Sequence, residues 1–300
     1  MSVSLALLPD FLLILLGWLI CRHTALDRPL WEGVERLVYY LLFPVLLFNS
    51  ILRTPLQPAQ TAGLALAGVG TVALGIVLAL AIGRWPRVDS RLHASGAQVA
   101  YRFNSYVALA LSERLFGAQG LAWMALLIAL SVPLCNVAAV WPLARHGGHS
   151  YLREIVRNPL IVSTAAGLAA NGLGLVLPDA VSTTLQRIGL AALPLGLMAV
   201  GAGLTFGALK ASPALAAALL AIRHAVLPAA ALAIVAVLVL SPAQASVVVL
   251  FAALPTASSA YVLATRMGGD GVFVAGLVTV STLLGMVSVP LWLSLQQALR

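Results

Sequence analysis

The chain has 300 residues, of which 61% are hydrophobic and only 9% are charged, with a mean hydropathy of +1.03. Soluble domains carry about 25% charged residues, so this composition excludes an ordinary soluble protein and predicts an all-α polytopic membrane protein. The net charge of +8 is spread over short connections. That pattern argues for lipid headgroup contacts and against nucleic-acid binding.

About ten apolar segments approach the ~20 residues that a helix needs to cross the hydrocarbon core. They lie near residues 3–21, 34–52, 60–83, 92–112, 120–143, 157–177, 187–208, 213–240, 245–264 and 271–296. The first segment lacks a basic leader and carries Asp10, which predicts a spanning helix and not a signal peptide. Cys21 and Cys135 fall at or within such segments, and we expect them to be packing residues.

Basic residues are distributed unequally between the two sides of the predicted helices. Connections after segments 1, 3, 5, 7 and 9 carry eleven Arg or Lys residues, and the opposite side carries four. Since cytoplasmic loops are rich in Arg and Lys, both termini are predicted to be periplasmic. Lys210 is the single lysine among 17 basic residues, which hints at a GC-rich bacterial genome and hence at a bacterial inner (plasma) membrane.

Short motifs recur in the two halves of the chain. Ser-Val-Pro-Leu at 131–134 returns at 288–291, and Pro44 in segment 2 corresponds to Pro194 in segment 7. Five helices per repeat means that the halves insert with opposite topology, which is typical of secondary transporters. The sequence therefore predicts two inverted five-helix repeats, at 1–148 and 149–300.

Segment 9 combines a proline with a run of hydroxyl side chains. The proline is Pro255, and the hydroxyl side chains that follow it belong to Thr256, Ser258, Ser259 and Tyr261. Proline removes a backbone donor, so the helix can unwind there into two halves whose free N–H groups bind an anion. The alternative is a plain proline kink whose hydroxyls bond back to the helix.

Segment 4 carries polar residues at the equivalent depth. Asn104 and Ser105 are candidate substrate ligands, since an amide donates well to a carboxylate, although an interhelical hydrogen bond is the alternative. Arg102 is expected to have a partner there, because a charge near the bilayer centre costs roughly 2.5–3.5 kcal/mol on insertion scales. The alternatives are that its side chain snorkels to the interface or binds backbone carbonyls of the segment. Arg223 and His224 in segment 8 are a second cationic spot, for structural pairing, an anion path or a proton relay.

The order and spacing of several motifs resemble the auxin efflux carrier family of membrane transporters over essentially the whole chain. The motifs are Tyr39-Tyr40 with Phe43-Pro44, Asn158-Pro159-Leu160, Leu177-Pro178, Ala192-Leu193-Pro194, Leu254-Pro255 with Tyr261-Val262-Leu263-Ala264, and Gly268-Gly269-Asp270. The resemblance implies ten helices with broken, crossed helices 4 and 9, as in sodium/proton antiporters and bile-acid symporters. It further implies a scaffold of helices 1, 2, 6 and 7 and a transport domain of helices 3–5 and 8–10.

This chain departs from the family pattern at helix 4, where Phe103 separates Arg102 from Asn104 and residues 105–109 contain no Gly or Pro. The helix break is therefore expected to be milder, or its substrate contacts different. Acidic residues are absent from the expected crossing, which argues against a cation/proton antiporter. Three driving forces remain open: membrane potential acting on a uniporter, protonation of His224, or sodium held by carbonyls and hydroxyls.

The sequence predicts a non-enzymatic secondary transporter, an efflux carrier for a small organic anion such as a carboxylate. It would work by alternating access with the substrate at the crossing of helices 4 and 9, and Phe48 and Asn49 would contribute from the scaffold. No cofactor or metal is expected, and the lipid bilayer is the other partner; a homodimer is left open. The rival interpretations are a sodium-coupled solute symporter of the same fold and a non-transporting membrane receptor or channel.

Overall fold

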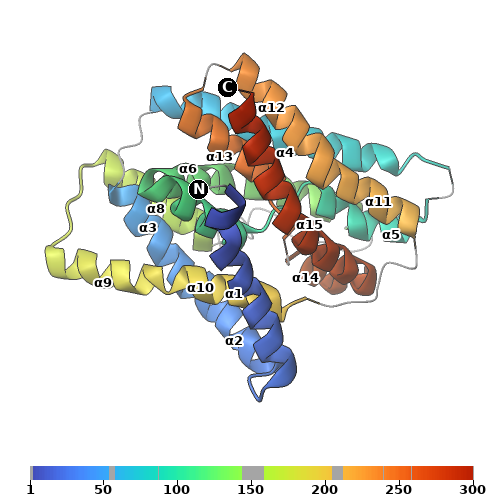
Figure 1. Cartoon of the computed structure of the whole chain (residues 1–300), viewed down its shortest axis with the longest axis horizontal. Coiled ribbons are helices and arrows are strands. Elements are labelled where there is room, and N and C mark those ends of the chain that lie inside the picture. The colour runs from blue at the N-terminus through green and yellow to red at the C-terminus, as the bar shows by residue number, and fades with distance from the viewer. Residues whose placement is uncertain are drawn as a thin grey trace. The chain divides into compact units, whose positions relative to one another are not determined.

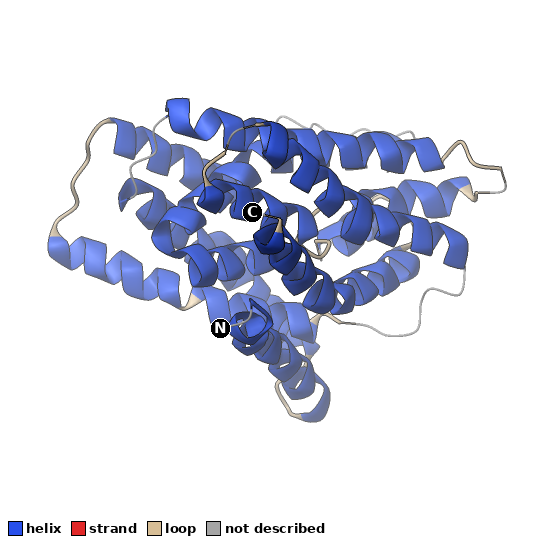
Figure 2. Ribbon diagram, turned by 45° about the horizontal axis from the view of Figure 1, so that its top comes forward, coloured by secondary structure: helices blue, strands red, loops and turns tan. Residues whose placement is uncertain are grey.

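The computed structural model describes residues 3–53, 58–86, 88–143, 159–204, 212–238, 240–257 and 259–299. Within these ranges all regular structure is helical and no strand occurs (Figure 2). The described part therefore has the all-α architecture of a polytopic membrane protein, as predicted.

Six helical stretches in the described residues are long and apolar enough to cross a membrane, judged by length and composition. They are Arg28–Arg53, Thr61–Ile82, Ser90–Ala139, Asp179–Ala202, Pro213–Val237 and Gly271–Ala298. Two shorter apolar helices cover Phe11–His23 and Pro242–Ala253. The arrangement of ten helices in two inverted repeats stays a prediction.

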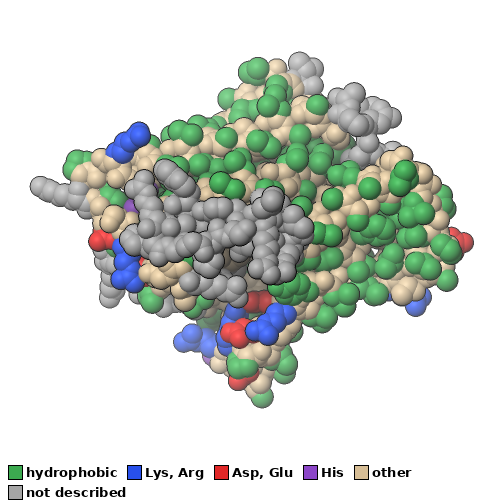
Figure 3. All heavy atoms as spheres, turned by 180° about the vertical axis from the view of Figure 1, so that it is seen from behind, with side chains coloured by type: hydrophobic (Ala, Val, Ile, Leu, Met, Phe, Trp, Pro, Cys, Tyr) green, Lys and Arg blue, Asp and Glu red, His purple; other side chains and the backbone are tan. Residues whose placement is uncertain are grey.

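Hydrophobic side chains are widespread on the described surface that is visible in Figure 3, and charged side chains are few there. Many large apolar residues are exposed, among them Leu66, Val77, Val162, Val287 and Leu291. Water would penalise such a surface, whereas lipid tails would not. The surface thus agrees with a chain that spans a membrane.

The chain forms two compact units. The first contains residues 1–62, 106–129 and 152–203, and the second contains residues 63–105, 130–151 and 204–300. Helix α4 (Pro58–Ile82) lies mostly in the second unit. The long α6 (Ser105–Leu143) contributes to both, and it is interrupted at Gly117, whose φ of 62° is a left-handed value that favours glycine.

The first unit is built from α1 (Val3–His23), α2 (Arg28–Leu37), the π-helical turn η1 (Val38–Leu42), α3 (Phe43–Arg53), α8 (Pro159–Gly172), α9 (Asp179–Leu190) and α10 (Ala192–Ala202). Helices α1 and α10 lie side by side (Figure 1). Gly17 of α1 meets the backbone of Met198, and Gly201 of α10 meets that of Ile14, so a Cβ at either glycine would clash. Small residues allow this close backbone approach between helices.

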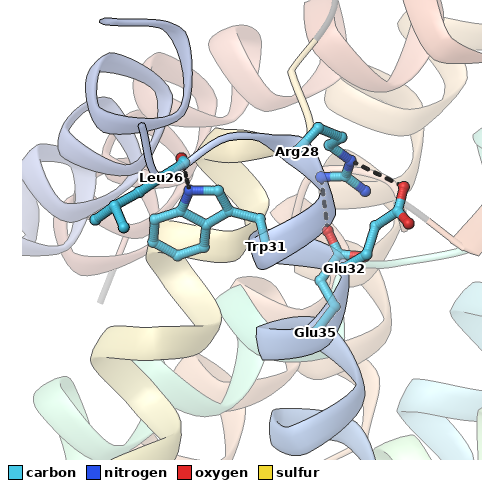
Figure 4. A network of polar contacts seen from close by, with 5 residues as sticks. All are labelled: Leu26, Arg28, Trp31, Glu32 and Glu35. Carbon is cyan, nitrogen blue, oxygen red and sulfur yellow. Dashed lines mark hydrogen bonds and ion pairs between the residues drawn. The ribbon is translucent and has the colours of Figure 1, made fainter. Parts of the chain in front are cut away.

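A polar cluster closes the connection between α1 and α2 (Figure 4). Arg28 pairs with Glu35 at 2.9 Å and with Glu32 at 3.7 Å. Trp31 donates its indole N–H to the carbonyl of Leu26 and packs against α10. Glu32 and Glu35, two of the nine carboxylates in the chain, are therefore paired with an arginine at the start of α2.

The second unit is built from most of α4, α5 (Ser90–Gly96), the 3-10 turn η2 (Ala97–Ala100), the end of α6, α11 (Pro213–Ala221), the π-helical turn η5 (Ile222–Val226), α12 (Leu227–Val237), α13 (Pro242–Ala253), α14 (Ser259–Arg266) and α15 (Gly271–Ala298). Every residue of α13 from Gln244 to Ala253 is buried. This helix packs against α12 and α15 and forms the centre of the unit.

Two wide π-helical turns precede prolines. Phe43 N–H donates to Val38 and Leu227 N–H to Ile222, each five residues back, and Pro44 and Pro228 follow directly. Proline has no N–H and its ring crowds the preceding turn, so a wider turn accommodates it inside a continuing helix. The turn η5 carries Arg223 and His224.

Candidate functional site

Two helices of the second unit are interrupted where the chain is buried. Between η2 and α6, residues 101–104 are non-helical, and we call them the first break. Between α13 and α14, residues 254–257 are non-helical, and we call them the second break. The backbone N–H of Asn104 donates to the carbonyl of Pro255 at 2.9 Å. The two breaks are thus hydrogen-bonded to each other.

Arg223 closes the end of α13 at the second break. Its Nε donates to the carbonyl of Leu254 at 2.6 Å, and its Nη2 donates to those of Phe251 and Ala252 at 3.0 Å each. These are terminal carbonyls that lack a helical partner, at the negative end of the helix dipole. Arg223 is only 2% exposed, so its charge serves the backbone of this break.

His224 connects the second break to α15. Its Nδ1 and Nε2 lie 2.9 and 2.8 Å from the hydroxyls of Ser288 and Ser281, and its carbonyl accepts from the Trp292 indole. The Ser281 hydroxyl in turn accepts from the backbone N–H of Thr256 at 2.9 Å. A buried polar path therefore runs from His224 to the unwound backbone.

The first break is held by side chains from elsewhere in the unit. Gln98 donates to the carbonyls of Ser95 and Ala260. Arg102 donates from Nη1 to Asn136 Oδ1 and from Nη2 to Ser259 Oγ, both at 3.1 Å. The Cys135 thiol lies 3.6 Å from the carbonyl of Tyr101. Asn136 and Cys135 both belong to α6, and Ser259 is the first residue of α14.

Several buried polar atoms at the breaks have no hydrogen-bond partner among the described residues. They include the hydroxyls of Thr256 and Tyr101, both 0% exposed, and Oε1 of Gln98. A buried polar group without a partner costs about 1–3 kcal/mol. The breaks therefore retain unused hydrogen-bonding capacity in a buried place.

The structure brings together most of the residues expected to bind substrate. Asn104, Pro255 and Thr256 are buried at the joined breaks, Ser105 begins α6 and Ser259 begins α14. Tyr261 lies on α14 with 44% exposure. Ser258 lies outside the described residues. Phe48 and Asn49 lie on α3 of the first unit, where Asn49 is buried and its Oδ1 has no hydrogen-bond partner among the described residues.

The sequence interpretation missed four residues of this neighbourhood. Gln98 and Asn136 were not singled out, although they are amides inside apolar segments. Ser281 and Ser288 stand seven residues apart, two helical turns, and therefore share one face of α15. Ser288 also opens the repeated Ser-Val-Pro-Leu motif. Spacing could have marked this pair, but nothing local indicated His224 as its partner.

The apolar helices and the buried, unwound backbone at their breaks define a multi-pass membrane protein with a polar site between half-helices. Non-helical backbone at such depth is tolerated where protein buries it or where it lines a cavity. Among the described residues, no group of three or more His, Cys, Asp or Glu side chains could hold a metal ion.

A family described as "Membrane transport protein" matches residues 142–293, just over half of the chain. The chain belongs to this family of transporters, the auxin efflux carriers, as its motifs suggested. It is also 29% identical over 218 residues to a Rhizobium meliloti (strain 1021) protein named "Putative malonate transporter". The matched region covers 69% of this chain and 68% of that protein. Both findings indicate a transport protein, not an enzyme.

Proposed function

We propose that this protein is a secondary transporter that exports a small organic anion, such as a carboxylate, by alternating access. The observation that carries the proposal is the hydrogen bond between Asn104 N–H and the Pro255 carbonyl, which joins two buried helix breaks. In secondary transporters, discontinuous helices of this kind form the substrate site. The breaks would be the crossing of helices 4 and 9 in an inverted-repeat fold.

The substrate carboxylate would bind beside the two half-helices that begin at the breaks. α6 starts at Ser105 and α14 at Ser259, so the positive ends of both helix dipoles lie there. Asn104 and the Thr256 hydroxyl would add side-chain donors. Tyr261, Ser258, Phe48 and Asn49 stay predicted contacts.

A small carboxylate is supported by the relative named as a malonate transporter. We infer that a short-chain carboxylate of this kind is the substrate to test first. A cytoplasmic anion would gain about 2.3 kcal/mol per unit charge per 100 mV of membrane potential on leaving the cell. Such a driving force would suffice for export without a coupling ion, and proton coupling through His224 and sodium coupling are the alternatives.

All residues of the joined breaks fall in the second compact unit. We infer that this unit corresponds to the transport domain and carries the substrate as one body, while α1, α3, α8 and α10 belong to the scaffold. Insertion in a bacterial inner membrane with periplasmic termini completes the proposal. A C-terminal reporter that is active only in the cytoplasm should be silent.

Counterflow in proteoliposomes tests the proposal, because exchange of labelled for unlabelled malonate requires a carrier. Wild-type protein should exchange malonate, and Asn104→Ala should lower the rate at least tenfold. Gln186→Ala is the matched control, since it removes an exposed amide of the first unit. Wild-type exchange by Asn104→Ala would refute the site. Malonate flux without exchange would favour a channel, and binding without flux a receptor.

A further inference from the structure

Arg102 places a full positive charge at the first break with only neutral partners. Its guanidinium donates to the Asn136 amide oxygen and the Ser259 hydroxyl, each at 3.1 Å. No carboxylate among the described residues lies within ion-pair distance of it. A guanidinium has five N–H donors, so three remain without a partner in the described part of the chain.

The surroundings of Arg102 add positive charge where an opposite charge would be expected. Ser259, its hydrogen-bond partner, is the first residue of α14, and α6 begins three residues after Arg102 at Ser105. A helix N-terminus carries roughly half a positive charge and is stabilised by anions, not by cations. Arg223 shows the opposite arrangement, because it binds the negative end of α13. An anion beside Arg102 would resolve the unfavourable contact.

The second break contains a side chain whose hydrogen-bonding capacity is unused. The Thr256 hydroxyl is fully buried and unpaired in the described structure, next to Pro255, whose carbonyl binds Asn104. Arg102 itself is only half-buried, so its guanidinium is partly accessible to a ligand. The joined breaks therefore contain two separate groups with unused hydrogen-bond donors, the Thr256 hydroxyl and the Arg102 guanidinium.

We propose that Arg102 binds a second carboxylate of the substrate and makes the site selective for short dicarboxylates over monocarboxylates. The inference rests on the proposed function, since it adds a second anionic subsite to the same crossing. Asn136 and Ser259 hold the guanidinium plane, so its remaining donors form a preorganised fork. Such a fork matches a carboxylate with two parallel hydrogen bonds, which an ammonium group does not reproduce.

The test compares malonate with monomethyl malonate, which has a similar size and one charge fewer. Competition in counterflow and ligand-induced thermal stabilisation are measured for wild type, Arg102→Gln and Arg102→Lys. Wild type should bind malonate at least about tenfold more tightly than the monoester, in line with a charge-assisted hydrogen bond. Arg102→Gln should abolish this preference and leave monoester binding within about threefold, and Arg102→Lys should restore part of it.

Arg91→Gln is the control, because it removes an exposed arginine from α5 of the same unit. It should keep the preference for malonate. Equal binding of both acids by wild type would overturn the dianion inference and leave carboxylate transport standing. Equal loss of both acids in Arg102→Gln and Arg102→Lys would assign the residue a structural role and also overturn it. A wild-type protein that neither binds nor exchanges either acid would overturn both proposals.

Discussion

The two helix breaks of the second unit are held by different chemistry. The second break is marked in the local sequence by Pro255, which lacks a backbone donor, and it is held by Arg223, which binds the carbonyls at the end of α13. The first break, residues 101–104, contains neither proline nor glycine. It is held instead by distant partners, including Pro255, Asn136 and Ser259.

The first break also packs against α13, the helix that precedes the second break. Phe103 packs against Phe251 of α13, with ring centroids 4.5 Å apart. Together with the bond from Asn104 to Pro255, this contact makes the geometry of the first break depend on the second. Damage at the second break should therefore spread to the first, and three substitutions test how far each break depends on its partners.

The largest effect is expected from Arg223→Met. The change leaves the three terminal carbonyls of α13 without their donors in a buried place, and hydrogen bonds to charged groups contribute about 1.5–3 kcal/mol each. We expect the free energy of unfolding to fall by on the order of 3 kcal/mol or more, together with loss of transport. Thermal unfolding in detergent measures the first effect and counterflow the second.

Two further variants distinguish the hydrogen bonds of the Arg223 guanidinium from the effect of its charge alone. Arg223→Lys keeps the charge without the planar fork and should recover only part of the stability. Arg91→Met, at an exposed position, should unfold like the wild type. A wild-type melting temperature for Arg223→Met would show that the break does not depend on this side chain.

A middle effect is expected from Ser281→Ala. The substitution removes the acceptor of the Thr256 N–H and one partner of His224, both of them buried. One buried donor without a partner costs about 1–3 kcal/mol. Thermal unfolding should register a loss in that range, and hydrogen exchange should become faster at the Thr256 amide.

The matched control for Ser281→Ala is Thr282→Val. The Thr282 hydroxyl donates to the Val278 carbonyl of its own helix, so its removal leaves no other segment unpaired. Equal losses in both variants would contradict a special role for Ser281.

The smallest effect is expected from Pro255→Ala. The break should persist, because Arg223 and Ser281 still bind the unwound backbone after an N–H is restored at position 255. We expect stability to change by less than about 1 kcal/mol and counterflow by less than about twofold. Pro242→Ala, at the exposed first position of α13, is the control. If Pro255→Ala loses transport and Pro242→Ala does not, the proline maintains the break, and the hydrogen bonds of Arg223 and Ser281 do not suffice.

The sequence predicted the second break better than the first. Proline beside hydroxyls is a local signal, so the interruption after Leu254 could be expected. The first break depends on residues such as Gln98 and Asn136, whose partners lie far along the chain. Arg223 was noticed as an intramembrane cation, but its partners are backbone carbonyls, which have no sequence signature. The π-helical turns at η1 and η5 were not predicted, although Pro44 and Pro228 mark both.

The chain has two cysteines, and one of them lies at the first break. Cys135 is buried with its thiol against the Tyr101 carbonyl, whereas Cys21 is partly exposed on α1. Replacing Cys21 with serine would therefore leave one native thiol as a chemical reporter of this site. Its alkylation rate would measure how often the first break opens, and a bound substrate that stabilises the closed form would slow the labelling. The conformational cycle could thus be followed without introducing a probe.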